Sequence, residues 1–192
     1  MNVTINQSTL LNLDLGPFST YVPPQYHHFF FAEPGVAPYR LLAYFSTLFT
    51  NQILVEIGVH NGWGSLALSY NPNNWVKGFD IDLSTLNPRI SEERPTTFFY
   101  EGLAHEMNPV VLLNSPLIHL DAQHDGVYEK VILDFLISNQ YQGWLLMDDI
   151  HLNPEMEELW KSVSIPKHDI TRYGHSTGTG LVTFNDPSYH HA

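Results

Sequence analysis

The hydrophobic positions along this chain alternate between short continuous runs and stretches with helical spacing. The continuous runs predict five strands, one beginning at Ile53 and the others at residues 75–80, 96–101, 116–121 and 143–148. Helical spacing predicts three clear helices, at residues 38–49, 124–138 and 154–163. Asn153 and Pro154 suit the N-cap and the first turn of the last helix. Because strands and helices alternate, we expect an α/β fold with a mostly parallel sheet covered on both faces.

The two ends of the chain do not follow this alternation. Residues 1–37 contain many aromatic residues and prolines without a clear period, so we expect a wrapping segment or lid before a domain at 38–186. Near the other end, residues 168–173 and 179–184 flank a turn-forming stretch, which predicts an antiparallel hairpin rather than another helical crossover. A short tail at 187–192 follows.

The first strand leads into a glycine-containing loop and then into a helix, an arrangement typical of ligand-binding α/β folds. The loop carries Gly58, Gly62 and Gly64 in the spacing G-x-x-x-G-x-G. Glycine lets the backbone approach a bound molecule closely. The spacing differs from the G-x-G-x-x-G of dinucleotide-binding loops, which argues against NAD as the ligand. His60 and Asn61, inside the loop, either contact the ligand or only shape the turn.

Acidic residues stand at the ends of four of the five predicted strands. They are Glu56 near the end of the first strand, Asp80, Asp121 and Asp148 at the ends of the second, fourth and fifth, and Asp149 directly after Asp148. A strand end that simply reaches solvent would also favour aspartate, but four such ends weaken this explanation. Since ligands of open α/β sheets bind at the carboxyl ends of the strands, we expect these carboxylates to line a binding site.

The acidic residues divide into two groups with different expected ligands. A carboxylate at the end of the second strand, here Asp80, is placed to accept both hydroxyls of a ribose, which predicts a nucleoside cofactor. If their strands are neighbours about 4.8 Å apart, the carboxylates of Asp121, Asp148 and Asp149 would repel unless a cation lay between them. An all-oxygen cluster favours Mg²⁺, Mn²⁺ or Ca²⁺ over zinc. Asp149 could instead cap the helix that follows it.

Composition narrows the classes of partner. Twenty Asp+Glu against eight Lys+Arg leave a formal net charge of −12, which repels phosphate backbones and anionic lipids, so we expect neither nucleic acid nor membrane as a partner. The absence of cysteine excludes disulfides and thiolate metal sites. The first residues lack the pattern of a signal peptide, and no apolar run has membrane-spanning length, which predicts a cytoplasmic protein. The sequence does not decide between a monomer and a homo-oligomer.

The order of these motifs resembles that of the class I S-adenosylmethionine (SAM)-dependent methyltransferases, and within them the metal-dependent sugar and small-molecule O-methyltransferases. The resemblance covers residues 38–184 and is carried by the glycine loop after Glu56, by Asp80, by Asp121-x-x-His124 and by Asp148-Asp149. It implies a Rossmann-like three-layer sandwich with a seven-stranded sheet, whose last strand belongs to a C-terminal hairpin and is antiparallel.

The resemblance also implies how the cofactor SAM would lie. Its methionine end would lie over the glycine loop and its ribose on the acid of the second strand, which assigns to it Glu56, Gly58, Gly62 and Asp80, with Asp121 as a further contact. Adenine usually meets the loop after the third strand, which makes Gly102 and Leu103 candidates. The sequence there, Glu-Gly-Leu-Ala, departs from the usual pattern of that loop.

Methyl transfer to oxygen requires an acceptor aligned with the sulfonium carbon and a group that removes or weakens the acceptor's proton. His124, predicted at the start of a helix that faces the crevice, is the candidate general base, with Asp121 as the second catalytic residue. A divalent cation, Mg²⁺ or Mn²⁺, on Asp121, Asp148 and Asp149 would lower the pKa of the acceptor. His124 could also be only a capping or surface histidine.

The acceptor is the part that the sequence constrains least. Few cations disfavour a highly phosphorylated acceptor unless a metal ion bridges it, so we expect a hydroxyl of a sugar or glycan before a catechol-like molecule. The aromatic residues of 1–37 either offer flat faces to such a ring or only cover hydrophobic surface. A metal-independent methyltransferase with Asp121 and His124 as an oriented base pair, and a noncatalytic SAM-binding protein, stay open. We expect His175 at the surface of the hairpin and leave His151 undecided between the acceptor site and a more remote position.

Overall fold

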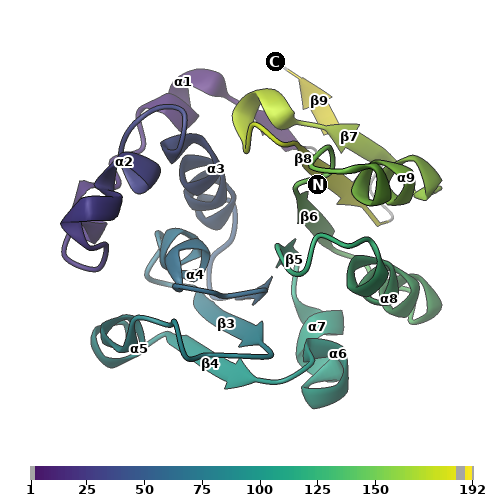
Figure 1. Ribbon diagram of the computed structural model, residues 1–192, viewed down its shortest axis with the longest axis horizontal. Coiled ribbons are helices and arrows are strands. Elements are labelled where there is room, and N and C mark those ends of the chain that lie inside the picture. The colour runs from purple at the N-terminus through teal and green to yellow at the C-terminus, as the bar shows by residue number, and fades with distance from the viewer. Residues whose placement is uncertain (1–2, 185–188, 192) are drawn as a thin grey trace.

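A seven-stranded sheet forms the centre of the computed structural model, which describes residues 3–184 and 189–191. Its strands, in sequence order, are β2 (Ile53–Ile57), β3 (Trp75–Asp80), β4 (Thr97–Glu101), β5 (Leu117–Leu120), β6 (Trp144–Asp148), β7 (Lys167–Asp169) and β8 (Thr179–Thr183). In space they follow the order β4, β3, β2, β5, β6, β8, β7. The sheet therefore starts at β2 in its interior, extends to β4 at one edge, and then continues from β5 on the other side of β2 (Figure 1).

Strand direction agrees with the sequence prediction. β2 pairs in parallel with β3 and β5, and the pairs β3·β4 and β5·β6 are also parallel. β8 runs antiparallel to both β6 and β7. The C-terminal hairpin, the antiparallel last strand and the Rossmann-like sandwich are confirmed. Because the strand order reverses between β2 and β5, the carboxyl ends of these two strands border a crevice.

Helices cover both faces of the sheet. α3 (Val36–Thr47) and α4 (Trp63–Leu68) pack on one face, and α7 (Pro109–Asn114), α8 (Val127–Ser138) and α9 (Pro154–Ser162) pack on the other (Figure 1). Successive strand residues point to opposite faces, so Leu54 joins the first helical layer and its neighbour Val55 joins the second. Both side chains are fully buried, which explains why this strand appears as a continuous apolar run in the sequence.

The segment before α3 folds over the layer formed by α3 and α4. It contains the strand β1 (Val3–Ile5), the helices α1 (Gln7–Leu11) and α2 (His27–Phe30), and the 3-10 turns η1 (Gly16–Phe18) and η2 (Pro24–Tyr26). Five of its buried apolar residues pack in one cluster with residues of α3, α4 and α5 (Pro88–Glu93), and they are Leu15, Phe18, Tyr21, Val22 and Phe30. β1 pairs in parallel with β9 (Tyr189–His191). These elements are too short to produce a periodic pattern, which is why the sequence did not predict them.

The helix predicted at 124–138 begins three residues later than expected, so the prediction that His124 lies at a helix start is wrong. Gly126 adopts a left-handed conformation with φ 74°, and α8 begins at the next residue. The carboxylate of Glu129 accepts hydrogen bonds from the backbone N–H groups of His124 (2.8 Å) and Gly126 (3.1 Å). This carboxylate fixes an irregular loop in front of α8, and the loop carries His124.

The bounds of the other two predicted helices hold within two residues. The helix predicted at 38–49 runs from Val36 to Thr47. The helix predicted at 154–163 ends at Ser162, and its N-cap is Asn153 as expected, since the side chain of this residue accepts a hydrogen bond from the N–H of Met156. Within the described residues, none of the helices combines the length and the apolar character that crossing a bilayer requires.

Candidate active site

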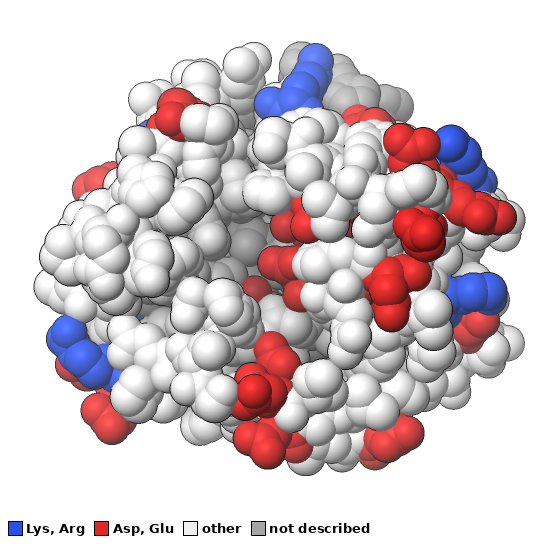
Figure 2. All heavy atoms as spheres, viewed as in Figure 1, with Lys and Arg blue, Asp and Glu red and all other residues white. Residues whose placement is uncertain are grey.

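One cavity of about 930 Å³ opens at the carboxyl ends of β2, β3, β5 and β6. It lies where the strand order reverses, the place where open α/β sheets bind ligands. Most of the residues that the sequence singled out line it, namely Glu56, Gly58, His60, Asn61, Gly64, Asp80, Gly102, Leu103, Asp121, His124, Asp148 and Asp149. Figure 2 shows acidic atoms along one wall of the central hollow and uncharged atoms along the opposite wall.

The glycine loop passes so close to its surroundings that two of its glycines cannot carry a side chain. A Cβ on Gly58 would lie 1.7 Å from the carbonyl oxygen of Asp121, and a Cβ on Gly64 would lie 1.8 Å from Oε1 of Glu56. Gly58 also has φ 88°, in the region that favours glycine. Gly62 lies outside the lining of the cavity and instead turns the backbone into α4 at φ 82°.

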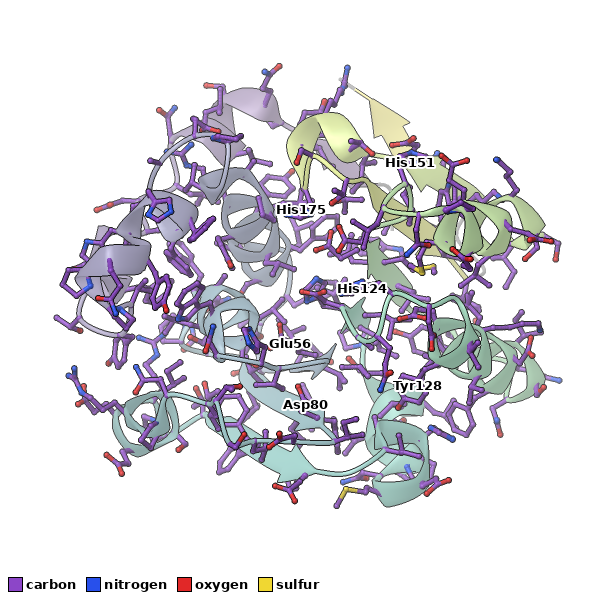
Figure 3. All side chains as sticks on the ribbon, in the orientation of Figure 1. Glu56, Asp80, His124, Tyr128, His151 and His175 are labelled. Atoms are coloured by element: carbon purple, nitrogen blue, oxygen red, sulfur yellow. The ribbon has the colours of Figure 1, made fainter. Side chains whose placement is uncertain are left out.

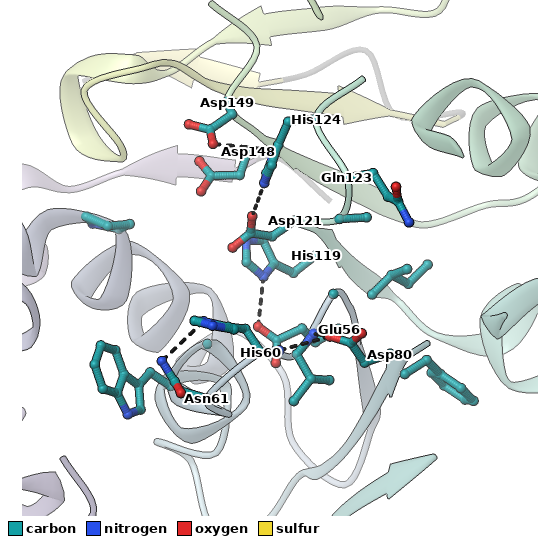
Figure 4. Close-up of a pocket in the computed structure, with 18 of the residues that line it drawn as sticks. Glu56, His60, Asn61, Asp80, His119, Asp121, Gln123, His124, Asp148 and Asp149 are labelled. Atoms are coloured by element: carbon teal, nitrogen blue, oxygen red, sulfur yellow. Dashed lines mark hydrogen bonds and ion pairs between the residues drawn. The ribbon is translucent and has the colours of Figure 1, made fainter. Parts of the chain in front are cut away.

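Asp80, the last residue of β3, holds the glycine loop from the side. Its Oδ2 accepts hydrogen bonds from the backbone N–H groups of Val59 (2.7 Å) and His60 (2.9 Å), and its Oδ1 accepts one from Asp82 (3.1 Å). A carboxylate offers about four lone-pair sites. Asp80 therefore keeps acceptor capacity for a ligand in the cavity that it borders (Figure 4).

Glu56 and His119 form a buried pair between neighbouring strands. The two residues are partners in the register of β2 and β5, and Oε1 of Glu56 lies 3.2 Å from Nδ1 of His119 (Figure 4). Ser65 of α4 donates a hydrogen bond to Oε2 of Glu56. Burial alone would lower the pKa of His119, but the hydrogen bond with Glu56 and the surrounding carboxylates raise it to about 9. The sequence analysis missed His119, because a histidine inside an apolar run resembles a core residue.

Asp121 and Asp148 place two carboxylates at the ends of the neighbouring strands β5 and β6. Burial, followed by the charge of Asp148, raises the pKa of Asp121 to about 8. Burial also raises the pKa of Asp148, although the neighbouring His119 and His175 act in the opposite direction. Thr179 donates a hydrogen bond of 3.3 Å to Oδ1 of Asp148. The negative charges of the two carboxylates therefore disfavour each other, as the sequence analysis expected.

Asp149 has a left-handed backbone conformation (φ 58°) and pairs with the C-terminal hairpin. Nδ1 of His175 lies 2.8 Å from its Oδ1, and the hydroxyl of Thr177 donates to the same oxygen. Burial alone would raise the pKa of Asp149, but these two hydrogen bonds lower it, and the first of them raises the pKa of His175 to about 9. His175 thus lines the cavity, which corrects the expectation that it lies on the outer surface (Figure 3). Asp149 does not cap α9, whose N-cap is Asn153.

His124 reaches two of these carboxylates from the loop before α8. Its Nε2 lies 3.3 Å from Oδ1 of Asp121, and its Nδ1 lies 3.4 Å from Oδ2 of Asp149 (Figures 3 and 4). The buried Nδ1 makes no hydrogen bond within the described part of the chain. Asn153 donates a hydrogen bond of 2.7 Å to the carbonyl oxygen of His124 and so holds the loop. An imidazole in this position can take a proton from a hydroxyl bound in the cavity.

The carboxylates and histidines form overlapping groups with the spacing that a divalent cation requires. There are three such groups among the described residues, and within each the ligand atoms lie within 4.8 Å of one another. The first is His119, Asp121 and Asp148; the second is Asp121, His124 and Asp149; the third is Asp148, Asp149 and His175. Each group thus combines two of the three predicted metal ligands, Asp121, Asp148 and Asp149, with one histidine, and the histidine differs from group to group. Carboxylate oxygens suit Mg²⁺ and Mn²⁺, and a ring nitrogen of His124 is a further donor. The residues present therefore fit a divalent cation.

The far end of the cavity is formed by the loop between β4 and α6 (Ala104–Met107). Gly102 has φ 138°, and its N–H donates a hydrogen bond of 2.6 Å to the carbonyl oxygen of Asp80. This contact places Gly102 and Leu103 beside the acid that ends β3.

His151 lies away from the cavity. Its Nε2 pairs at 2.8 Å with Oδ2 of Asp169, and both side chains are partly exposed. His151 is absent from the cavity lining and is separated from His124 in Figure 3. Of the two positions that the sequence left open for His151, the acceptor site and a more remote one, the structure shows the more remote one.

Aromatic residues that the sequence analysis did not assign to the site also line the cavity. They are Tyr26 and Phe29 of the N-terminal segment, Tyr39 of α3, Trp63 of α4, Phe79 of β3 and Tyr128 of α8. Burial, and then the negative charges of Asp121, Glu56 and Asp148, raise the pKa of Tyr39, so its hydroxyl stays protonated. The N-terminal segment therefore both covers hydrophobic surface and contributes to the cavity wall.

Solved structures of O-methyltransferases share this fold. TomG, an O-methyltransferase from Streptomyces achromogenes solved in complex with SAM, has a TM-score of 0.63 at 16% identity, over 93% of this chain and 94% of that chain. CalS11, a TDP-rhamnose 3'-O-methyltransferase of calicheamicin biosynthesis, has a TM-score of 0.59 at 14% identity, over 93% of this chain and 91% of that chain. Cofactor-bound Rv0187 from MTB has a TM-score of 0.61 at 14% identity, over 93% and 94%. No family model matches the sequence, and no curated protein matches it. At these identities the likeness establishes the fold.

Proposed function

We propose that this protein is a SAM-dependent O-methyltransferase that acts on a hydroxyl of a small molecule or glycan. The observation that carries the proposal is that the glycine loop, Asp80 and His124 line one cavity at the switch point of the sheet. The same fold occurs in TomG, whose solved structure contains SAM. A noncatalytic SAM-binding protein would need the glycine loop and Asp80 but not a histidine between two carboxylates.

The cofactor would lie along the edge formed by β2, β3 and β4. Its methionine end would face Glu56 and the glycine loop at Gly58, both of which line the cavity. Its ribose would bind Asp80, and its adenine would lie beside Gly102 and Leu103. His60 and Asn61 border the same region and hydrogen bond to each other, with 3.1 Å between Nδ2 of Asn61 and Nδ1 of His60.

The acceptor hydroxyl would lie near His124, which would take its proton as the methyl group is transferred. Asp121 and Asp149, 3.3 Å and 3.4 Å from the two ring nitrogens, would orient the imidazole. A divalent cation, Mg²⁺ or Mn²⁺, held by Asp121, Asp148 and Asp149 would polarise the acceptor hydroxyl when bound.

A sugar hydroxyl is the acceptor that we favour. CalS11, which shares the fold, is named a TDP-rhamnose 3'-O-methyltransferase, so its acceptor is a sugar joined to a nucleotide. The formal net charge of −12 makes a nucleic-acid acceptor unfavourable. A catechol-like acceptor is the next candidate, because it also presents a hydroxyl on a ring.

Calorimetry with SAM and with its demethylated product, with and without Mg²⁺, tests the cofactor assignment. We expect saturable binding of both compounds, followed by methyl transfer in a screen of sugar and catechol acceptors. If neither compound binds to the folded protein, the proposed function is wrong. If both bind and no variant of His124 changes turnover of an active acceptor, the base assignment is wrong.

A metal-independent reaction is a second candidate, because His124 already lies 3.3 Å from Asp121 and could act with it alone. Removal of divalent cations with a chelator distinguishes the two. Loss of turnover that Mg²⁺ or Mn²⁺ restores supports the metal-assisted reaction. Full turnover in the chelator supports the base pair of Asp121 and His124.

A further inference from the structure

The charge of the cavity wall restricts which acceptors can enter. Six carboxylates line the cavity, and they belong to Glu56, Asp80, Asp121, Asp125, Asp148 and Asp149. All eight lysine and arginine residues of the chain lie within residues 3–184, and none of their side chains lines the cavity. A phosphate group inside this wall would therefore meet repulsion from the carboxylates without a lysine or arginine as a partner.

The histidines of the cavity do not supply a positive charge that is free to bind a phosphate group. His119 pairs with Glu56 and His175 pairs with Asp149, so the charge of each of these imidazoles is matched by a carboxylate in direct contact. Charge on His124 would be shared between Asp121 and Asp149. No basic side chain is left to form the bidentate or paired contacts by which proteins usually hold phosphate.

The wall opposite the carboxylates is aromatic and uncharged (Figure 2). Tyr26 and Phe29 are 42% and 50% exposed, so each keeps a ring surface available to a ligand. Their ring centroids are 6.5 Å apart with planes tilted by 31°, and the ring of Tyr26 lies 5.6 Å from that of Trp63. These rings together form a continuous apolar surface at the cavity.

This aromatic wall is anchored to the core rather than to a free loop. Phe30, next to Phe29 in α2, is fully buried and stacks on Tyr39 of α3 with 4.3 Å between ring centroids. Phe30 also meets the ring of Phe18 edge to face at 6.4 Å. Consecutive residues of α2 thus serve two purposes, because Phe30 fixes the segment while Phe29 borders the cavity. A wall that is already ordered costs little entropy when a ligand packs on it.

We propose that the acceptor is an uncharged hydroxyl compound whose ring packs on Tyr26 and Phe29, and that the cavity rejects the same ring when it carries a phosphate. This inference rests on the proposed function and specifies its substrate class. A sugar ring presents C–H groups and a phenol presents a π face, and both suit an aromatic wall. A sugar joined to a nucleoside diphosphate, the form in the name of CalS11, would bring negative charge toward the carboxylates, so on this inference the acceptor of this protein differs from that of CalS11.

Matched acceptors test the charge selection. Binding of methyl α-glucoside, α-glucose 1-phosphate and catechol is measured by saturation-transfer NMR, with the demethylated cofactor present and with Mg²⁺ or chelator. We expect the uncharged glucoside or catechol to bind at least about tenfold more tightly than the phosphate under both conditions. Equal or tighter binding of the phosphate overturns the proposal, as does the absence of binding by both uncharged rings. Cofactor calorimetry by itself tests the proposed function, so the two failures are distinguishable.

Variants test the two walls separately. Tyr26→Ala and Phe29→Ala should each raise the KM or Kd of the uncharged acceptor several-fold and leave the affinity for SAM unchanged. Phe98→Ala is the matched control, since Phe98 is 42% exposed on the edge strand β4 and does not line the cavity. Gln123→Arg places a cation at the exposed rim and should improve binding of glucose 1-phosphate. Acceptor affinity that is unchanged in both alanine variants, or no gain for the phosphate in Gln123→Arg, overturns the proposal.

Discussion

Glu56 and His119 are register partners on β2 and β5, and their side chains meet 3.2 Å apart with almost no solvent exposure. The pair explains how a carboxylate can stand inside an apolar strand next to the proposed cofactor site. A buried carboxylate without a partner costs several kcal/mol, and the imidazole of His119 together with the hydroxyl of Ser65 compensates it. The pair also gives the protein a predictable response to pH.

The raised pKa of His119 predicts that the metal-free protein loses stability as the pH rises from about 6.5 to about 9. A group whose folded pKa lies above its unfolded pKa stabilises the protein fully below the unfolded value, and this stabilisation disappears as the pH passes the folded value. His119→Gln removes the titrating group, so the variant should show a smaller loss over this window. Urea unfolding in chelator at pH 6 and pH 9.5 measures the difference. Equal pH dependence in the two proteins would contradict the pairing.

Gly64→Ala should destabilise the protein and weaken SAM binding, because the new Cβ would lie 1.8 Å from Oε1 of Glu56. We expect a loss of about 1–3 kcal/mol in the free energy of unfolding, typical of an added methyl group in a packed site. Gly16→Ala is the control, since its Cβ would meet only the side chain of Asp14, whose nearest atom is 2.9 Å away and can move. Thermal unfolding and calorimetry measure both effects. If Gly16→Ala loses as much stability and SAM affinity as Gly64→Ala, the contact between the new Cβ and Glu56 is not the cause of the loss.

Asp80→Asn should reduce the affinity for SAM while the fold is kept. The asparagine amide has a single oxygen and no negative charge. It cannot accept the two backbone N–H hydrogen bonds that Oδ2 accepts and also accept charge-assisted hydrogen bonds from a ribose. We expect the Kd to rise roughly 10- to 100-fold. Asp82→Asn is a matched control, because Asp82 is exposed and does not line the cavity. An Asp80→Asn protein that binds SAM as tightly as the wild type would remove the ribose assignment.

His124→Gln should lower kcat by roughly 10²- to 10⁴-fold and leave the Kd for SAM nearly unchanged, as expected for loss of a general base. His151→Gln provides the comparison, since this histidine pairs with Asp169 outside the cavity. Its kcat should equal that of the wild type. A similar kcat for both variants would show that proton transfer does not depend on His124.

Mg²⁺ should raise the Tm of the wild type but not that of Asp148→Asn. At ten times the Kd, binding contributes about 1.4 kcal/mol, which corresponds to roughly 3–6 °C for a domain of this size. In the absence of metal the variant should be at least as stable as the wild type, because burial already raises the pKa of Asp148 and disfavours its charge. Asp134→Asn, which alters an exposed pair with Lys130, should keep the response to Mg²⁺. The same rise in Tm for Asp148→Asn would exclude Asp148 as a metal ligand.

The local patterns of the sequence were sufficient to predict five strands of the sheet, the hairpin and the carboxylates that line the cavity at the strand ends. The first strand and the glycine turn after it are encoded within a few consecutive residues, through continuous apolar burial and the left-handed backbone of Gly58. Asp80 and Asp148 could be placed together because parallel strands end at one edge of the sheet. This inference needed the direction of the strands and not the detailed contacts.

Contacts between distant segments could not be obtained in this way. His119 looks like a core residue until the register of β2 and β5 sets it opposite Glu56, 63 positions earlier in the chain. His175 belongs to a hairpin that appeared peripheral, and only the folded hairpin brings it to Asp149.

The sequence by itself thus determined which strands form and which carboxylates end them, because these properties depend on neighbours within a few residues. The tertiary structure decided the partners of those carboxylates, the loop position of His124 and the aromatic wall at Phe29. The physical reason is that such contacts depend on strand register, on the left-handed turn at Gly126 and on packing of the N-terminal segment against α3. Each of these features depends on contacts across the whole fold, and none of them produces a repeating pattern of hydrophobic residues in the sequence.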